Sequence, residues 1–374
     1  MEKWDRTIIV VTKGDSFYKE SDSKYIIREN NFEDYVQLLY LLEKEKRSTL
    51  TYIHQFSLTE EAAAGASDFP FAQLTNSSYY SLLHLAKALG YIETANKNEK
   101  NLFVISNNLH SVGGNEEVIV DKAGLTGLIR NIPIEFPLVK LKHIDFDFLS
   151  GRVNFELIAR QIAGEVIRPE GSCLLAYRGK KRYVEDFKPI EMMQEFPDFS
   201  TENRGWNILF CEDDRLKDDY LLPVRSALSG LKKGKLTLVS RRPLNNVKAL
   251  EELIEKGIEV ETVECDFYNK NELDSLLAAL PRESIDGIFC AGLVKEDEYS
   301  RFILEAHEQQ RELDYTGEKW SFVMNLFNGT KDLNYKFVMF CLPGVLYTGK
   351  QSNSLGAGLL HAINGLCAMQ IVLI

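Results

Sequence analysis

A run of acidic side chains follows the short apolar segment Trp206–Cys211. The segment has the pattern of a buried parallel strand, and leucines within 221–231 can form the inner face of a helix after it. In a nucleotide-binding α/β unit, a glycine-rich turn joins such a strand and helix, so that free N–H groups can bind a pyrophosphate. The turn here runs from Glu212 to Asp219 and contains five carboxylates and no glycine. Because carboxylates repel phosphate oxygens, we expect this frame to have lost its nucleotide contact.

The acidic turn also has a purely structural explanation. Asp218 or Asp219 can cap the following helix while the other carboxylates lie in solvent. A turn of that kind is itself incompatible with a tight pyrophosphate site, so both explanations lead to the same expectation.

Further motifs follow this turn in a characteristic order and spacing. They are Leu238–Arg242, Cys265–Asp266, Ile288–Gly292, Lys319 with Asn325–Leu326 six residues later, Phe337–Leu342, and Gly349–Ser354. With these motifs, the second half of the chain resembles the ketoreductase domain of modular polyketide synthases. That family is a branch of the short-chain dehydrogenase/reductase superfamily.

The resemblance implies roles for four residues. Arg241 and Arg242 stand where the family holds the 2′-phosphate of NADPH, Asp266 stands where it contacts adenine, and Lys319 matches its catalytic lysine. The alternative for Arg241 and Arg242 is that they are surface residues at a strand end. The alternative for Lys319 is a solvated or ion-paired side chain. We therefore regard all four residues as remnants of a site.

The resemblance also implies a serine that orients the substrate carbonyl and a tyrosine that donates a proton to it. The serine position is occupied by Leu342, which cannot form a hydrogen bond, and the tyrosine position by Ser354. Tyr347 is a nearby phenol, but it lies seven residues too early in the sequence. Together with the acidic turn, these changes predict a domain that binds no NADPH and reduces nothing. The family's lid helix is not recognisable before Ile374, so residues 368–374 are either its last strand arriving early or the end of a cut chain.

The first half resembles the structural subdomain of the same family, a truncated copy of the fold without a cofactor. The matching segments are Ala123–Arg130, Ile132–Glu135, His143–Phe146, and Cys173–Tyr177 with Arg178, Gly179 and Arg182. The phrase IPIEFP at 132–137 favours the trans-acyltransferase branch.

Strand-like and helix-like segments alternate along the chain, which indicates parallel sheets covered on both faces. We expect two tandem Rossmann-type subdomains of α/β class, a truncated one over residues 1–205 and a catalytic-type one over 206–374. Expected strands are 7–12, 50–54, 101–106, 139–145, 173–177, 206–211, 235–240, 259–265, 285–290 and 335–341. Expected helices include 30–46, 79–89 ended by Gly90, 122–130 ended by Pro133, 153–166 and 272–280, and residues 179–204 are expected to be a connector.

Composition limits the classes of partner. A net charge of −11 argues against nucleic acid and against an anionic membrane surface. The six cysteines and six histidines are dispersed, which predicts buried free thiols in a reducing compartment and no structural metal site. We find no signal peptide and no apolar span of membrane length, so we expect a cytoplasmic protein.

Three hypotheses follow. The first is a non-reducing ketoreductase-like domain with an architectural role in a polyketide synthase, contacting neighbouring domains and an acyl carrier protein. The second is an active NADPH-dependent β-ketoacyl-thioester reductase that uses an unrecognised proton donor. The third is a stand-alone acidic protein that binds a basic partner.

Overall fold

The computed structural model has two compact units. Its described residues up to Asp186 form the first unit, and those from Trp206 onward form the second. The structure describes residues 8–44, 51–59, 76–93, 98–114, 116–119, 122–149, 151, 153–171, 173–186, 206–212, 233–241, 251, 254–280, 285–291, 321–323, 325–326, 328–330, 333, 335 and 337–340. The predicted boundary after residue 205 lies outside these residues and stays a prediction.

The first unit begins with a small sheet in the order β1-β3-β2. Its strands are β1 (Val10–Lys13), β2 (Tyr18–Ser21) and β3 (Lys24–Ile27), of which only the first was predicted, with different bounds. Helix α1 (Phe32–Lys44) follows, and Tyr35, Leu38, Leu39 and Leu42 are buried on one face as its spacing predicts. Helix α1 packs against α3 (Ser81–Glu93), which continues from the π-helical turn η2 (Asn76–Tyr80).

The main sheet of the first unit has the order β4-β5-β6-β7-β8. The first four strands are parallel neighbours in chain order, and β8 pairs with β7 in antiparallel fashion. Their bounds are Thr51–Ser57, Lys100–Asn107, Val139–Phe146, Leu174–Arg178 and Lys181–Val184. The expected connector at 179–204 is thus wrong at its start, because the turn at Gly179 reverses the chain into β8.

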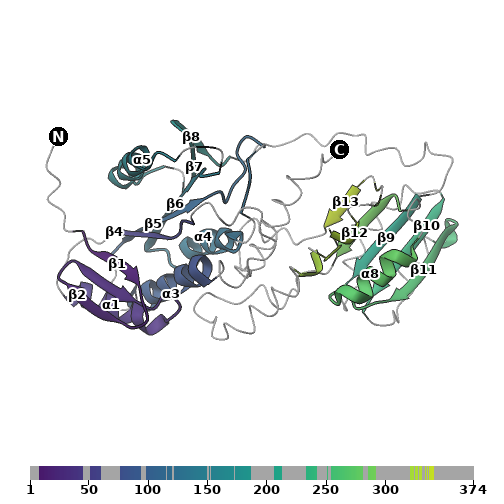
Figure 1. The fold of residues 1–374 in the computed structure, drawn as a ribbon, viewed down its shortest axis with the longest axis horizontal. Helices are drawn as coiled ribbons and strands as arrows, with labels where there is room; N and C mark the ends of the chain where they lie inside the picture. Colours follow the sequence, from purple (N-terminus) through teal and green to yellow (C-terminus); the bar gives the residue numbers. More distant parts are fainter. Residues whose placement is uncertain are drawn as a thin grey trace. The chain divides into compact units, whose positions relative to one another are not determined.

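Helices cover both faces of this sheet. Figure 1 shows α5 (Phe155–Ile167) on one face and α3 and α4 (Gly124–Glu135) on the other. The apolar side chains of α5 pack on a core that includes Phe103, Ile105 and Ile144. Since β5, β6 and β7 are parallel neighbours in chain order, the crossovers through α4 and α5 have opposite hands. One of them departs from the right-handed rule.

The second unit contains a parallel sheet in the order β11-β10-β9-β12-β13. The strands are β9 (Trp206–Glu212), β10 (Gly234–Ser240), β11 (Ile258–Glu264), β12 (Gly287–Ala291) and β13 (Phe337–Phe340). Helix α8 (Lys270–Ala279) joins β11 to β12, and its N-terminus is capped by the side chain of Asn269. After β9 the chain adds β10 and β11 on one side of this strand, and it then adds β12 and β13 on the other side. This reversal is that of a doubly wound fold.

Two predicted helix ends are wrong. Helix α3 continues through Gly90. A side chain at this position would lie 2.3 Å from a carbon of the Phe136 ring, so the glycine permits close packing of the helix against that ring. Helix α4 continues through Pro133 to Glu135, although proline removes one hydrogen bond of the helix, and the neighbouring Ile132 is fully buried. No helix among the described residues is long and apolar enough to cross a membrane.

Candidate functional site

Arg241 and Asp266 lie together at the carboxyl ends of β10 and β11, which is where open parallel sheets bind ligands. The Nε atom of Arg241 is 3.0 Å from Oδ1 of Asp266, and both side chains are about one-third exposed, at 34% and 39%. The guanidinium carbon lies 4.8 Å from the centre of the Tyr268 ring. The N–H of Tyr268 donates to Asp266, and the N–H of Asp266 donates to Glu272.

This arrangement brings together two residues that the sequence placed in one site, although it does not test their roles. The planar guanidinium stacks on an aromatic ring and is partly neutralised by a carboxylate. The carboxylates of Glu264, Asp266 and Glu272 are located at or just after the end of β11. The residues around Arg241 therefore fit an incoming phosphate poorly, because most of the charge there has the same sign as the phosphate.

Three buried thiols lie near the same edge of the sheet. Cys211 on β9 and Cys290 on β12 are register partners, and Cys265 directly follows β11. Burial raises the pKa of the Cys265 thiol to about 11, with further contributions from Glu272 and Cys211. This thiol stays protonated near neutral pH, so it cannot serve as a nucleophile. These cysteines confirm the prediction of buried free thiols, whereas Cys173 is exposed.

The remaining predicted site residues lie outside the described part of the chain. They are Arg242, Lys319, Leu342, Ser354 and the acidic turn beyond Glu212. Their roles stay predictions. No cluster of three or more histidine, cysteine or carboxylate side chains suited to a metal ion occurs among the described residues.

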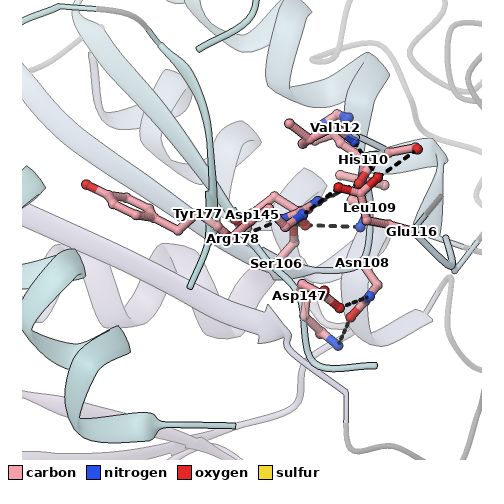
Figure 2. A network of polar contacts seen from close by, with 12 residues as sticks. Ser106, Asn108, Leu109, His110, Val112, Glu116, Asp145, Asp147, Tyr177 and Arg178 are labelled. Atoms are coloured by element: carbon pink, nitrogen blue, oxygen red, sulfur yellow. Dashed lines mark hydrogen bonds and ion pairs between the residues drawn. The ribbon is translucent and has the colours of Figure 1, made fainter. Parts of the chain in front are cut away.

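Sequence reasoning assigned no function to a polar cluster at the carboxyl ends of β5, β6 and β7. Figure 2 shows Asp145 at its centre, with contacts to Ser106 and Arg178. The Ser106 hydroxyl donates to Asp145 at 2.6 Å and lies 2.8 Å from Nε2 of His143, so the imidazole is the donor in that second contact. The N–H groups of Leu109 and His110 donate to the same carboxylate at 3.0 and 3.3 Å.

Arg178 provides the counter-charge of this cluster. Its Nη2 atom is 3.1 Å from Oδ2 of Asp145, and the same atom donates to the carbonyl of His110. Asp145 is fully buried. Burial alone would raise its pKa, but His110, Arg178, His143 and the Ser106 hydroxyl together hold the pKa below its ordinary value.

Two other groups in this region have shifted pKa values. Burial lowers the pKa of His110 to about 4, and the attraction of Asp145 only partly compensates. Burial also lowers the pKa of Lys122 to about 7, while its Nζ atom donates to the carbonyl and side-chain oxygens of Asn107 at 3.0 and 2.7 Å. Lys122 is fully buried and His110 is partly exposed, and the contacts of the cluster fix the loop after β5.

A signal for this cluster was present in the sequence. His143 and Asp145 occur at alternate positions near the end of the strand VKLKHIDF, and Ser106 follows the apolar run of β5. Polar side chains on a buried sheet face need partners on neighbouring strands. The register pairs Ser106 with Asp145 directly.

Two family models match separate parts of the chain. Residues 225–355 match the KR domain, and residues 1–160 match a family described as beta-ketoacyl synthase-like, N-terminal. The resemblance to ketoreductase domains is confirmed. No curated protein matches the chain.

Solved structures support the ketoreductase-like fold. One is the adenylation, ketoreductase and pseudo Asub multidomain structure of a keto acid-selecting NRPS module, with 17% identity and a TM-score of 0.76 over 98% of this chain and 30% of that one. Another is an N-terminal ketoreductase from the macrolactin assembly line, with 19% identity and a TM-score of 0.70 over 96% of this chain and 69% of that one. An A1-type ketoreductase has 20% identity and a TM-score of 0.69 over 93% and 70%. The predicted α/β class with Rossmann-type subdomains is thereby confirmed.

Proposed function

We propose that this ketoreductase-like chain is a non-reducing domain of a polyketide synthase, binds no NADPH, and has an architectural role. Its partners would be neighbouring domains of the same assembly line and an acyl carrier protein. The observation that carries the proposal is a contrast in the second unit. Its strand order is that of a nucleotide-binding sheet, whereas the residues at its carboxyl edge are unsuited to that ligand.

The unsuitable residues come from separate places in the sequence. The segment Glu212–Asp219 contains five carboxylates, Leu342 replaces the expected serine, and Ser354 replaces the expected tyrosine. A serine hydroxyl is a far weaker acid than a phenol, so it cannot supply the carbonyl oxygen with a proton as readily. The similar structures support the assembly-line setting, because they come from a keto acid-selecting NRPS module and from the macrolactin assembly line.

Titration with NADPH tests this proposal. We expect no saturable change in nicotinamide fluorescence up to about millimolar cofactor, because the phosphate groups meet like charge. An Arg241→Ala variant provides the control, since any residual binding through this guanidinium should weaken in it. Saturable binding at low micromolar NADPH would contradict the proposal.

One observation favours an active β-ketoacyl-thioester reductase instead. Arg241 and Asp266 converge at adjacent strand ends, as the family's adenine and 2′-phosphate contacts would require. In that case, NADPH supplies a hydride, and the protein must hold the thioester carbonyl and deliver a proton to its oxygen. Loss of NADPH absorbance with a β-ketoacyl thioester, abolished by Lys319→Ala, would establish this alternative.

A further inference from the structure

The loop after β5 wraps closely around one carboxylate of its own chain. Glu116 accepts hydrogen bonds from the N–H groups of Val112, Gly113 and Gly114 at 2.7 to 3.1 Å. The Ser111 hydroxyl donates to it at 3.1 Å. We call residues 111–114 the nest, because successive backbone N–H groups converge on one point there and form an anion-binding concavity.

The nest is a built site. The Nε atom of Arg178 lies 3.4 Å from Oε1 of Glu116, and the two side chains are only 11% and 14% exposed. Figure 2 shows Glu116 in the same network as Val112 of the nest and Arg178. Burial alone would raise the pKa of Glu116, but the Gly113 N–H, the Ser111 hydroxyl and Arg178 overcome this effect and lower it. The carboxylate therefore stays ionised in the nest at neutral pH.

We propose that the nest is an oxyanion-binding site that the chain's own Glu116 keeps closed. The ligand class is a carboxylate or a phosphate group from outside the loop. Arg178 already balances Asp145 at 3.1 Å, so its charge does not require Glu116. Without Glu116, the three N–H groups and the hydroxyl would face solvent beside a neutral ion pair. This is a favourable setting for an incoming anion.

The surroundings of the nest permit an outside ligand. Ser111, Gly113 and Gly114 are exposed, so an anion can approach from solvent once the glutamate is absent. Gly114 has a φ of +85°, and a Cβ at Gly113 would lie 3.3 Å from Oε1 of Glu116. Both glycines thus serve the close approach of backbone to anion.

The experiment compares Glu116→Ala with Glu117→Ala. Both remove one negative charge from the same loop, but Glu117 is exposed and takes no part in the nest. Each full-length variant is titrated by calorimetry with inorganic phosphate and with acetate at constant ionic strength, because salt screens weak binding. We expect Glu116→Ala to bind one of these anions at least about tenfold more tightly than Glu117→Ala or the unaltered chain. The better ligand decides between a phosphate and a carboxylate.

Equal affinities in the two alanine variants, with circular dichroism showing both folded, would overturn the proposal. If Glu116→Ala does not fold, Glu116→Ser provides a second variant whose side chain is too short to fill the nest. A phosphate or acetate affinity for Glu116→Ser that is no higher than that of the Glu117→Ala control would equally overturn the proposal.

Discussion

The two main sheets of this protein use their carboxyl edges differently. In the first sheet, strands β4 to β7 are neighbours in chain order without reversal. The carboxylates of Asp145 and Glu116 accept hydrogen bonds from the N–H groups of the loop after β5. In the second, the order reverses between β9 and β12, and Arg241 with Asp266 stands partly exposed at the edge. In open parallel sheets, ligands bind outside the carboxyl ends of the strands at such a reversal. The carboxyl edge of a parallel sheet can therefore be filled by the chain's own side chains, as in the first unit, or left partly exposed, as in the second.

Acidification should affect the first unit most strongly. Burial lowers the pKa of His54 to about 3, and the pKa values of His84 and His110 to about 4, from an ordinary value of 6.5. Since the unfolded chain binds these protons near pH 6.5 and the folded chain does not, stability is full above that pH and is lost as the pH falls toward 4. Each histidine contributes a slope of about 1 kcal/mol per pH unit in that window.

Hydrogen exchange measured at several pH values, corrected for intrinsic rates, tests this prediction. Amides of β5 and β6 should lose protection below about pH 6, whereas those of β9 and β10 should not. His84 lies among the rings of Phe32, Tyr35 and Tyr80, so His84→Phe should flatten the pH dependence. An equal loss of protection in both sheets would contradict the prediction.

Removing the central carboxylate of the first sheet should have the next largest effect. In Asp145→Ala, the largely buried Arg178 loses its carboxylate partner and two backbone N–H groups lose their acceptor, at a cost of about 3–5 kcal/mol. The corresponding Asp266→Ala change breaks a partly exposed pair and should cost about 0–1 kcal/mol. Opening free energies of the β6 and β11 amides give both values. Similar losses of stability in Asp145→Ala and Asp266→Ala would contradict the difference between the carboxyl edges of the two sheets.

Helix α5 provides a smaller test, because its only buried residue among the described ones, Glu165, is charged. Glu165 accepts from Arg182 at 2.6 Å, from Tyr177 at 2.7 Å and from Lys142 at 3.1 Å. These hydrogen bonds and burial, which opposes them, leave its pKa near 2. Glu165→Gln should destabilise α5 by about 1–3 kcal/mol, measured by hydrogen exchange of its amides.

Glu156 is the matched control on the same helix. It pairs with Arg160 in solvent, and both side chains are 76% exposed. Glu156→Gln should therefore change stability by less than about 0.5 kcal/mol. If both glutamine variants destabilise α5 equally, the buried network does not hold this helix in place.

The smallest expected effect is that of Arg241→Ala on stability. The ion pair with Asp266 and the stacking on Tyr268 are partly exposed, so the loss should be less than about 1 kcal/mol, measured by urea unfolding. A much larger loss of stability would mean that the carboxyl edge of the second sheet is also held together by its own side chains.

Local patterns in the sequence determined most of the secondary structure. Apolar runs predicted all strands of the second sheet, and the spacing of leucines predicted the buried face of α1. These patterns are reliable because they depend on periods of two and 3.6 residues along one segment. Motif order likewise determined the ketoreductase resemblance, and it placed Arg241 and Asp266 in one site before the fold brought them together.

Tertiary structure alone decided what depends on distant neighbours. Gly90 stays inside α3 because the ring of Phe136 lies against it, and Lys181–Val184 becomes a strand because it pairs back onto β7. The register of β5 and β6 sets Ser106 beside Asp145, and the fold of the loop encloses Glu116 in backbone N–H groups. A sequence shows that such polar groups exist, but only the packed chain decides which donors surround them.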